Sequence, residues 1–145
     1  GLTCAIASHG FAGGFKTGFN NLKHQDALIE QTKKTIDEAA EFGCQRVIAF
    51  VGMKWNDPDD PKSGEIPRDT ALTNCIRGFK KIVGYAEKKK VILCLEHLNT
   101  RDGSHPMKGH PGYQGDDLDF VSSIIRSVDS PSLKLLFDVY HVQVM

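Results

Sequence analysis

An uninterrupted apolar run, Val91-Ile92-Leu93-Cys94-Leu95, ends at Glu96, and this pattern constrains the fold more than any other part of the chain. A second, largely apolar run over 133–137 leads directly into Asp138, with His141 three residues later. Apolar runs of this length are typical of buried strands in a parallel sheet. Because functional side chains of such sheets collect at the carboxyl ends of the strands, both carboxylates are expected at one end of the same sheet.

The rest of the chain alternates between strand and helix patterns, which predicts an α/β fold with parallel strands and outer helices. Apolar runs predict strands at 2–7, 46–51, 91–96 and 133–137. Apolar residues at helical spacing predict a helix that Asp26 caps and Gly43 ends, a helix that Asp69 or Thr70 opens, and a helix over 118–128. Two long loops are expected at 55–67 and 101–115, and the first should contain no regular structure.

Two architectures fit this alternation: a small doubly wound sheet, or part of a (β/α) barrel. A doubly wound sheet that binds a dinucleotide needs a glycine-rich phosphate turn after its first strand, and Gly10-Phe11-Ala12-Gly13-Gly14 matches G-x-G-x-x-G poorly. A barrel accounts better for the polar strand ends, although four strands cannot close one. The sequence therefore favours a partial barrel that forms a single domain over residues 1–145.

Composition disfavours several classes of protein. The 18 basic and 18 acidic residues cancel without forming a basic stripe, so we expect no nucleic-acid partner. No apolar run approaches the length of a membrane span and no charged-then-apolar leader is present, which predicts no membrane partner and a cytoplasmic location. The cysteines are scattered without a C-x-x-C pair and are expected to be reduced core residues: Cys4, Cys44, Cys75 and Cys94.

Polar side chains follow each predicted strand, and each has a structural as well as a functional interpretation. Glu96 could form an ion pair with a neighbouring strand as readily as it could serve a functional site. The Asp138-x-x-His141 pair favours a functional site, because an aspartate at such a strand end has few structural uses. His9 is open between the two interpretations, whereas His97 is expected to be structural.

Three segments resemble the hydroxypyruvate isomerase branch of the xylose isomerase-like TIM barrels, a superfamily that also holds ketose epimerases and an apurinic endonuclease. In chain order they are Leu95-Glu96-His97-Leu98-Asn99-Thr100-Arg101, Lys108-Gly109-His110-Pro111-Gly112-Tyr113 and Leu136-Phe137-Asp138-Val139-Tyr140-His141-Val142-Gln143. The resemblance runs along the whole chain and implies about half of a TIM barrel, from the second to the fifth βα unit. It also implies that further metal ligands and a second catalytic glutamate lie beyond Met145.

The resemblance assigns roles to individual residues. It implies that Glu96 is a metal ligand and an acid/base glutamate, and that Asp138 is a second ligand of the same divalent ion. Mg²⁺ or Mn²⁺ is the expected ion, because hard cations prefer carboxylate oxygens. It further implies that His141 contacts substrate oxygens. Other residues expected to bind substrate are His9, after the first predicted strand, and the loop residues Arg101, Lys108, His110 and Tyr113.

The expected function is a metal-assisted aldose–ketose isomerase of a small hydroxy-carbonyl compound, with hydroxypyruvate and tartronate semialdehyde as the expected pair. A carboxylate can move the proton between neighbouring carbons if the developing charge is stabilised. A ketose 3-epimerase of the same superfamily is the close alternative. A non-catalytic half barrel that needs a partner, such as a second copy in a homo-oligomer, is the alternative of a different class, because a half barrel exposes two strand edges. The neutral charge disfavours an apurinic endonuclease.

Overall fold

The structure is a computed structural model that describes residues 1–8 and 13–145. Its main sheet holds three parallel strands in the order β1 (Arg46–Ala49), β4 (Ile92–Glu96) and β5 (Leu133–Leu136). The longer helices are α1 (Leu22–Glu41), α2 (Arg68–Lys89) and α3 (Leu118–Val128). Two short helices are also present in the described residues: the 3-10 helix Gly14–Lys16, and α4 (Val139–Val144), which follows β5.

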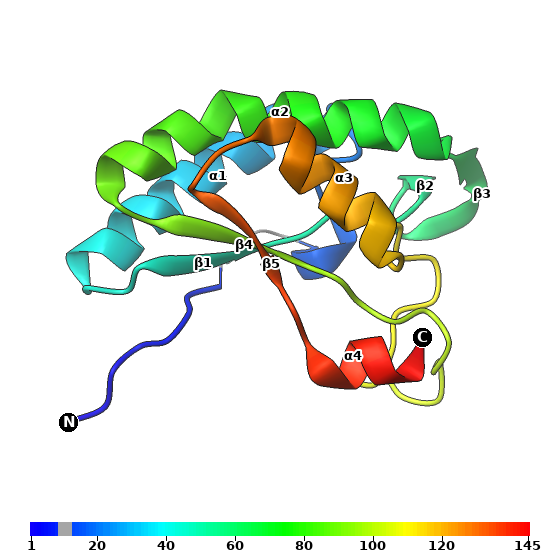
Figure 1. The fold of residues 1–145 in the computed structure, drawn as a ribbon. Helices are drawn as coiled ribbons and strands as arrows, with labels where there is room; N and C mark the ends of the chain where they lie inside the picture. The colour runs from blue at the N-terminus through cyan, green and yellow to red at the C-terminus, as the bar shows by residue number, and fades with distance from the viewer. Residues whose placement is uncertain (9–12) are drawn as a thin grey trace.

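The arrangement of these elements decides between the two architectures. Each parallel strand pairs with the next parallel strand along the chain, and α1, α2 and α3 all lie on the same side of the sheet (Figure 1). A doubly wound sheet would reverse its strand order and carry helices on both faces. The prediction of a partial barrel with parallel strands and outer helices is therefore confirmed.

The predicted helices are present, but α1 begins earlier than expected. The side chain of Asn21 caps this helix by accepting a hydrogen bond from the N–H of Lys23 at 3.0 Å. Asp26 is instead an exposed residue of the helix, where its carboxylate lies 3.0 Å from the ammonium of Lys81. The predicted stop is correct: Gly43 follows the helix with a φ of 72°, a conformation that favours glycine.

The prediction that 55–67 contains no regular structure is wrong. Strands β2 (Trp55–Asp57) and β3 (Asp60–Glu65) form an antiparallel hairpin in this segment. Its prolines are tolerated because a two-stranded ribbon has only edge strands, in which a missing N–H donor costs little. Ser63 adds side-chain contacts, since its hydroxyl accepts a hydrogen bond from the N–H of Asp57 at 2.8 Å.

The predicted strand over 2–7 is reduced to one parallel bridge between Ala7 and Val47. Ala7 donates to the carbonyl of Arg46 and accepts from the N–H of Ile48, both at 2.9 Å, and the preceding residues extend away from the sheet (Figure 1). Cys4 is consequently exposed, which corrects its assignment to the core. The other three cysteines are buried free thiols, as predicted.

Backbone packing at the carboxyl end of the sheet is unusually close between two segments far apart in sequence. A Cβ on Gly18 would lie 2.0 Å from the carbonyl oxygen of Val51, so only glycine fits at this position. The N–H of Asn20 donates to the same carbonyl at 3.0 Å. This contact holds the segment that carries Phe15 next to the end of β1.

Within the described residues, no helix has both the length and the apolar character needed to cross a membrane.

Candidate active site

Glu96 is the last residue of β4 and pairs with Leu136 of β5 in the parallel register. Its side chain is buried, with 9% of the residue's surface exposed. Burial raises the pKa of the Glu96 carboxyl to about 7, and the nearby Asp138 carboxylate acts in the same direction. A carboxyl group with a pKa near neutrality can both accept and release a proton under physiological conditions.

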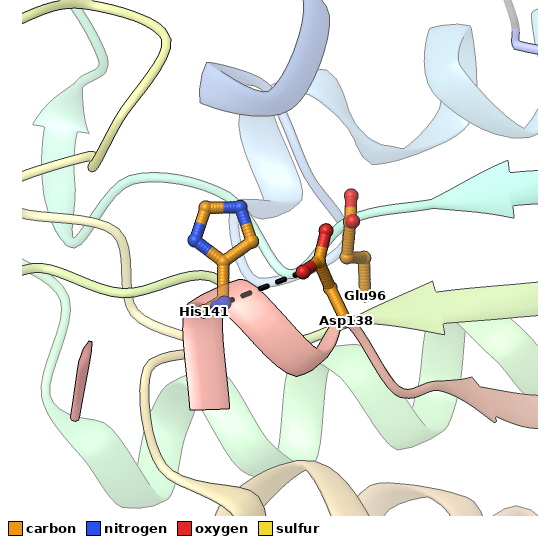
Figure 2. A group of neighbouring side chains, drawn as sticks. All are labelled: Glu96, Asp138 and His141. Atoms are coloured by element: carbon orange, nitrogen blue, oxygen red, sulfur yellow. Dashed lines mark hydrogen bonds between the residues drawn. The ribbon is translucent and has the colours of Figure 1, made fainter. Parts of the chain in front are cut away.

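Asp138 follows β5 and caps α4, which explains why a helix begins at this strand end. Its carboxylate accepts hydrogen bonds from the N–H of Tyr140 at 2.8 Å and from the N–H of His141 at 3.3 Å. The spacing of three residues therefore places His141 in the first turn of the helix, directly beside its cap. Figure 2 shows the three side chains at the ends of β4 and β5, with the imidazole of His141 beside the two carboxylates.

The three side chains form a cluster that fits a divalent cation. One potential ligand atom from each of Glu96, Asp138 and His141 lies within 4.8 Å of the others. The salt bridges of the described residues involve neither carboxylate, so the alternative of a structural ion pair at Glu96 is not supported. Neighbouring carboxylates without a Lys or Arg partner are a donor set that hard divalent cations prefer.

A pocket of about 340 Å³ opens over this cluster. His110 is the one loop residue of the predicted substrate set that lines it, and its ring lies 4.1 Å from the ring of Phe15, centroid to centroid. Burial lowers the pKa of His110, and the nearby His141 lowers it further, so this imidazole favours its neutral form. The rest of the wall is mainly apolar: Phe15, Phe50, Leu98, Pro106 and Met107.

His141 is buried, with 7% of its surface exposed, and is held by Asn99. Its Nδ1 atom lies 2.7 Å from the side-chain nitrogen of Asn99 and 3.2 Å from the backbone nitrogen of the same residue. Burial lowers the pKa of His141, while the Asp138 carboxylate acts in the opposite direction. The imidazole is therefore fixed in position at the edge of the pocket.

The structure does not bring the other predicted substrate residues into the pocket. Arg101 and Lys108 are exposed on the loop and are absent from the pocket lining. Tyr113 is buried, and its hydroxyl accepts from the N–H of Val51 and donates to the carbonyl of Glu96, so it has no free group for a substrate. The structure thus lends no support to the prediction that Tyr113 binds substrate. His9 lies outside the described residues.

Sequence reasoning missed the aromatic wall of the pocket. Phe15 lies in the segment after the first predicted strand, where the only visible signal was a group of glycines. Its position depends on the close contact between Gly18 and Val51, which no local pattern reveals. Phe50 could have been proposed from its place at the end of the second predicted strand.

Comparison with known proteins decides the family. The family model described as "Xylose isomerase-like TIM barrel" matches residues 1–145. The chain belongs to this family. Among curated relatives, the chain is 28% identical over 104 residues to 2-oxo-tetronate isomerase of Cupriavidus necator, covering 69% of this chain and 37% of that protein. It is 24% identical over 139 residues to a putative hydroxypyruvate isomerase of Caenorhabditis elegans, covering 90% of this chain and 46% of that protein.

Three solved structures with the same fold are named as different proteins. AP endonuclease, family 2, from Brucella melitensis has a TM-score of 0.76 and 20% identity, with 99% of this chain and 51% of that chain covered. A D-tagatose 3-epimerase-like protein has a TM-score of 0.72 and 18% identity, with coverages of 94% and 45%. The IOLI protein, solved with a zinc atom, has a TM-score of 0.70 and 16% identity, with coverages of 94% and 41%.

These comparisons define what the chain represents. It spans less than half the length of the curated relatives and about half the length of the solved structures that it resembles. It is thus a partial barrel of the xylose isomerase-like family, and the two curated relatives are named as isomerases.

Proposed function

We propose that this chain carries part of the active site of a metal-assisted aldose–ketose isomerase that acts on a small hydroxy-carbonyl compound. The proposed substrate pair is tartronate semialdehyde and hydroxypyruvate, which both carry a carboxylate next to the reacting carbons. One observation supports the proposal above the others: Glu96, Asp138 and His141 converge at the ends of adjacent parallel strands, within one pocket. The name of the putative hydroxypyruvate isomerase is consistent with it.

Glu96 is proposed to move the proton. It would take a proton from the hydroxyl-bearing carbon of the aldehyde form and return it to the former carbonyl carbon, while the hydroxyl proton passes to the former carbonyl oxygen. In the metal-free protein this carboxyl has a pKa of about 7, and a bound cation would lower it and so favour the carboxylate that takes up the proton. His141 lies beside the carboxylates and is proposed to donate a hydrogen bond to a substrate oxygen, which stabilises negative charge as it develops.

Glu96 and Asp138 are proposed to hold the divalent cation, with Mg²⁺ or Mn²⁺ as the ions that match carboxylate oxygens. When bound, such a cation polarises the substrate oxygens and holds them in register. A carboxylate has two oxygens, so Glu96 can offer one to the cation and keep the other for the proton. The zinc atom of the IOLI protein supports a metal in this fold without fixing the identity of the metal here.

Substrate assay tests this proposal directly. The intact protein with Mn²⁺ should convert tartronate semialdehyde to hydroxypyruvate, and in D₂O the product should carry solvent deuterium. Glu96→Gln should lower the rate by about 10²- to 10⁴-fold, the usual contribution of a positioned acid or base. Glu41→Gln, at an exposed position at the end of α1, is the matched control and should leave the rate unchanged. No conversion by the wild-type protein with Mn²⁺ would overturn the proposal.

A ketose 3-epimerase is the second candidate, and the likeness to a D-tagatose 3-epimerase-like structure favours it. Glu96 would then remove the proton from one face of a single carbon, and a second acid on the opposite face, such as the glutamate that the resemblance places beyond Met145, would return one with inversion of that carbon. Incubation with a ketohexose separates the two functions, because an epimerase forms the 3-epimer whereas an isomerase of small hydroxy acids does not.

We also propose a cytoplasmic location, assembly as a homo-oligomer, and no nucleic-acid partner. The last of these proposals rests on the neutral charge of the chain.

A further inference from the structure

We propose that Asn99 is a positioning residue that fixes His141 in the tautomer with its proton on Nε2. His141 then presents an N–H donor to the pocket and offers no lone pair to a metal ion. That this N–H donates to a substrate oxygen rests on the proposed function. The tautomer itself does not depend on that function and can be measured without an activity assay.

Two backbone groups fix the orientation of the Asn99 side-chain amide. Its Oδ1 atom accepts a hydrogen bond from the N–H of Asp102 at 3.1 Å, and its Nδ2 atom donates to the carbonyl of Lys108 at 2.7 Å. A backbone N–H can only donate and a backbone carbonyl can only accept. The oxygen and nitrogen of this amide are therefore assigned without any reference to the histidine.

The second hydrogen of the same Nδ2 atom faces His141. The distance between Asn99 Nδ2 and His141 Nδ1 is 2.7 Å, and the backbone N–H of Asn99 approaches the same ring nitrogen at 3.2 Å. Two donors thus converge on Nδ1, which must accept and cannot carry a proton. In a neutral imidazole the proton is then on Nε2.

Close packing holds this arrangement. Asn99 is fully buried, and a Cβ added to Gly109 would lie 2.4 Å from Asn99 Oδ1, so the loop backbone presses directly on the amide. A rotated amide would lose the bonds to the N–H of Asp102 and the carbonyl of Lys108, because its oxygen would then face the carbonyl and its nitrogen the N–H. The amide therefore has one stable orientation, and the histidine has one stable tautomer.

This assignment divides the cluster into two kinds of group. Distances alone would allow three metal ligands, since atoms of Glu96, Asp138 and His141 lie within 4.8 Å of one another. A histidine ligand must offer a nitrogen lone pair. Nδ1 of His141 uses its lone pair to accept from Asn99, and Nε2 carries the proton. The ligands from this part of the chain are then the two carboxylates, and His141 is left to donate to an oxygen atom.

Nitrogen NMR of the intact protein labelled with ¹⁵N-histidine, loaded with Mg²⁺, tests the inference. Two-bond proton–nitrogen correlations show which ring nitrogen carries the proton, and the His141 signals are those missing in His141→Gln. We expect protonated Nε2 and unprotonated Nδ1. His97 is an internal control, because its Nε2 atom must donate to the carbonyl of Asp116 at 2.8 Å. A proton on Nδ1 of His141 in the wild-type protein would overturn the proposal.

The variant Asn99→Asp tests the residue itself. A carboxylate keeps the acceptor for the N–H of Asp102 but replaces the donor that faces His141, so the Nδ1 proton should become the major form. His97 should keep its tautomer. Unchanged Nε2 protonation of His141 in a folded Asn99→Asp protein would refute the role of the Asn99 side chain, because only the backbone N–H of residue 99 would then face Nδ1. If circular dichroism shows that this variant is unfolded, Asn99→Ser replaces it, with a mixture of both tautomers expected and unchanged Nε2 protonation again refuting the role.

Activity of the same variants separates this inference from the proposed function. If Asn99 only supported the fold, Asn99→Asp would lower stability and leave the His141 signals unchanged. If it positions the donor, kcat should fall more than KM rises, because a hydrogen bond to developing charge acts mainly in the transition state. A wild-type protein without isomerase activity but with the expected tautomer would refute the proposed function alone.

Discussion

The hydroxyl of Tyr113 donates a hydrogen bond to the backbone carbonyl of Glu96 at 2.9 Å. The same hydroxyl accepts from the N–H of Val51 at 2.8 Å, so one side chain joins the carboxyl ends of two neighbouring strands. Burial raises the pKa of Tyr113 well above its usual value, which keeps the hydroxyl protonated and able to donate. A residue of the loop over the site thus serves to hold Glu96 in place.

Replacement of Tyr113 by Phe should lower the free energy of unfolding by about 1–3 kcal/mol, because the buried N–H of Val51 and carbonyl of Glu96 lose their partner. Urea denaturation measures the change. Tyr140→Phe is the matched control, because the hydroxyl of Tyr140 is exposed and makes only a long hydrogen bond, of 3.4 Å, to Asp102. An equal loss of stability in both variants would contradict the assigned role of Tyr113.

Asp138→Asn should weaken metal binding and keep the fold. Asparagine caps helices as well as aspartate does, so α4 should remain, but the negative charge next to Glu96 is lost. Calorimetric titration with Mn²⁺ should show an affinity at least about tenfold weaker. Asp119→Asn, an exposed substitution in the first turn of α3, should bind Mn²⁺ as the wild type does. Equal affinities for all three proteins would exclude Asp138 as a ligand.

Glu96→Gln should stabilise the metal-free protein, and more at pH 8 than at pH 5. The raised pKa of Glu96, about 7 against a usual 4.5, means that the folded state keeps a proton that the unfolded state has already lost. Wild-type stability therefore falls as the pH rises between these values, and the loss is complete above pH 7. Urea midpoints of both proteins across this range check the prediction, and a wild-type advantage at pH 8 would show that the sign is wrong.

Gly18→Ala should prevent normal folding or cost about 3 kcal/mol or more, because the added methyl group would overlap the carbonyl of Val51. Gly84→Ala is the opposite case. This glycine lies on the exposed face of α2 with open space around it, and alanine there should stabilise the protein by about 0.5–1 kcal/mol. Thermal unfolding of both variants tests the pair, and a tolerated Gly18→Ala would contradict the close approach of the two segments.

Local patterns in the sequence were sufficient for the elements that make up the barrel. Apolar runs located β1, β4 and β5, and helical spacing located α1, α2 and α3, because burial against one sheet imposes a period on each segment. The pattern failed where burial is weak. The hairpin over β2 and β3 is mostly exposed and has no apolar period, and of the strand predicted over 2–7 only Ala7 pairs.

The sequence by itself determined that Glu96 and Asp138 lie at the same end of the sheet, since parallel strands share their direction. Only the tertiary structure decided which other residues join them. Asn99 and His141 are 42 residues apart, and Tyr113 and Val51 are 62 apart, so their contacts depend on loop paths that no local period encodes. Strand direction follows from the order of apolar segments, whereas side-chain contacts between loops follow from close packing of the folded chain.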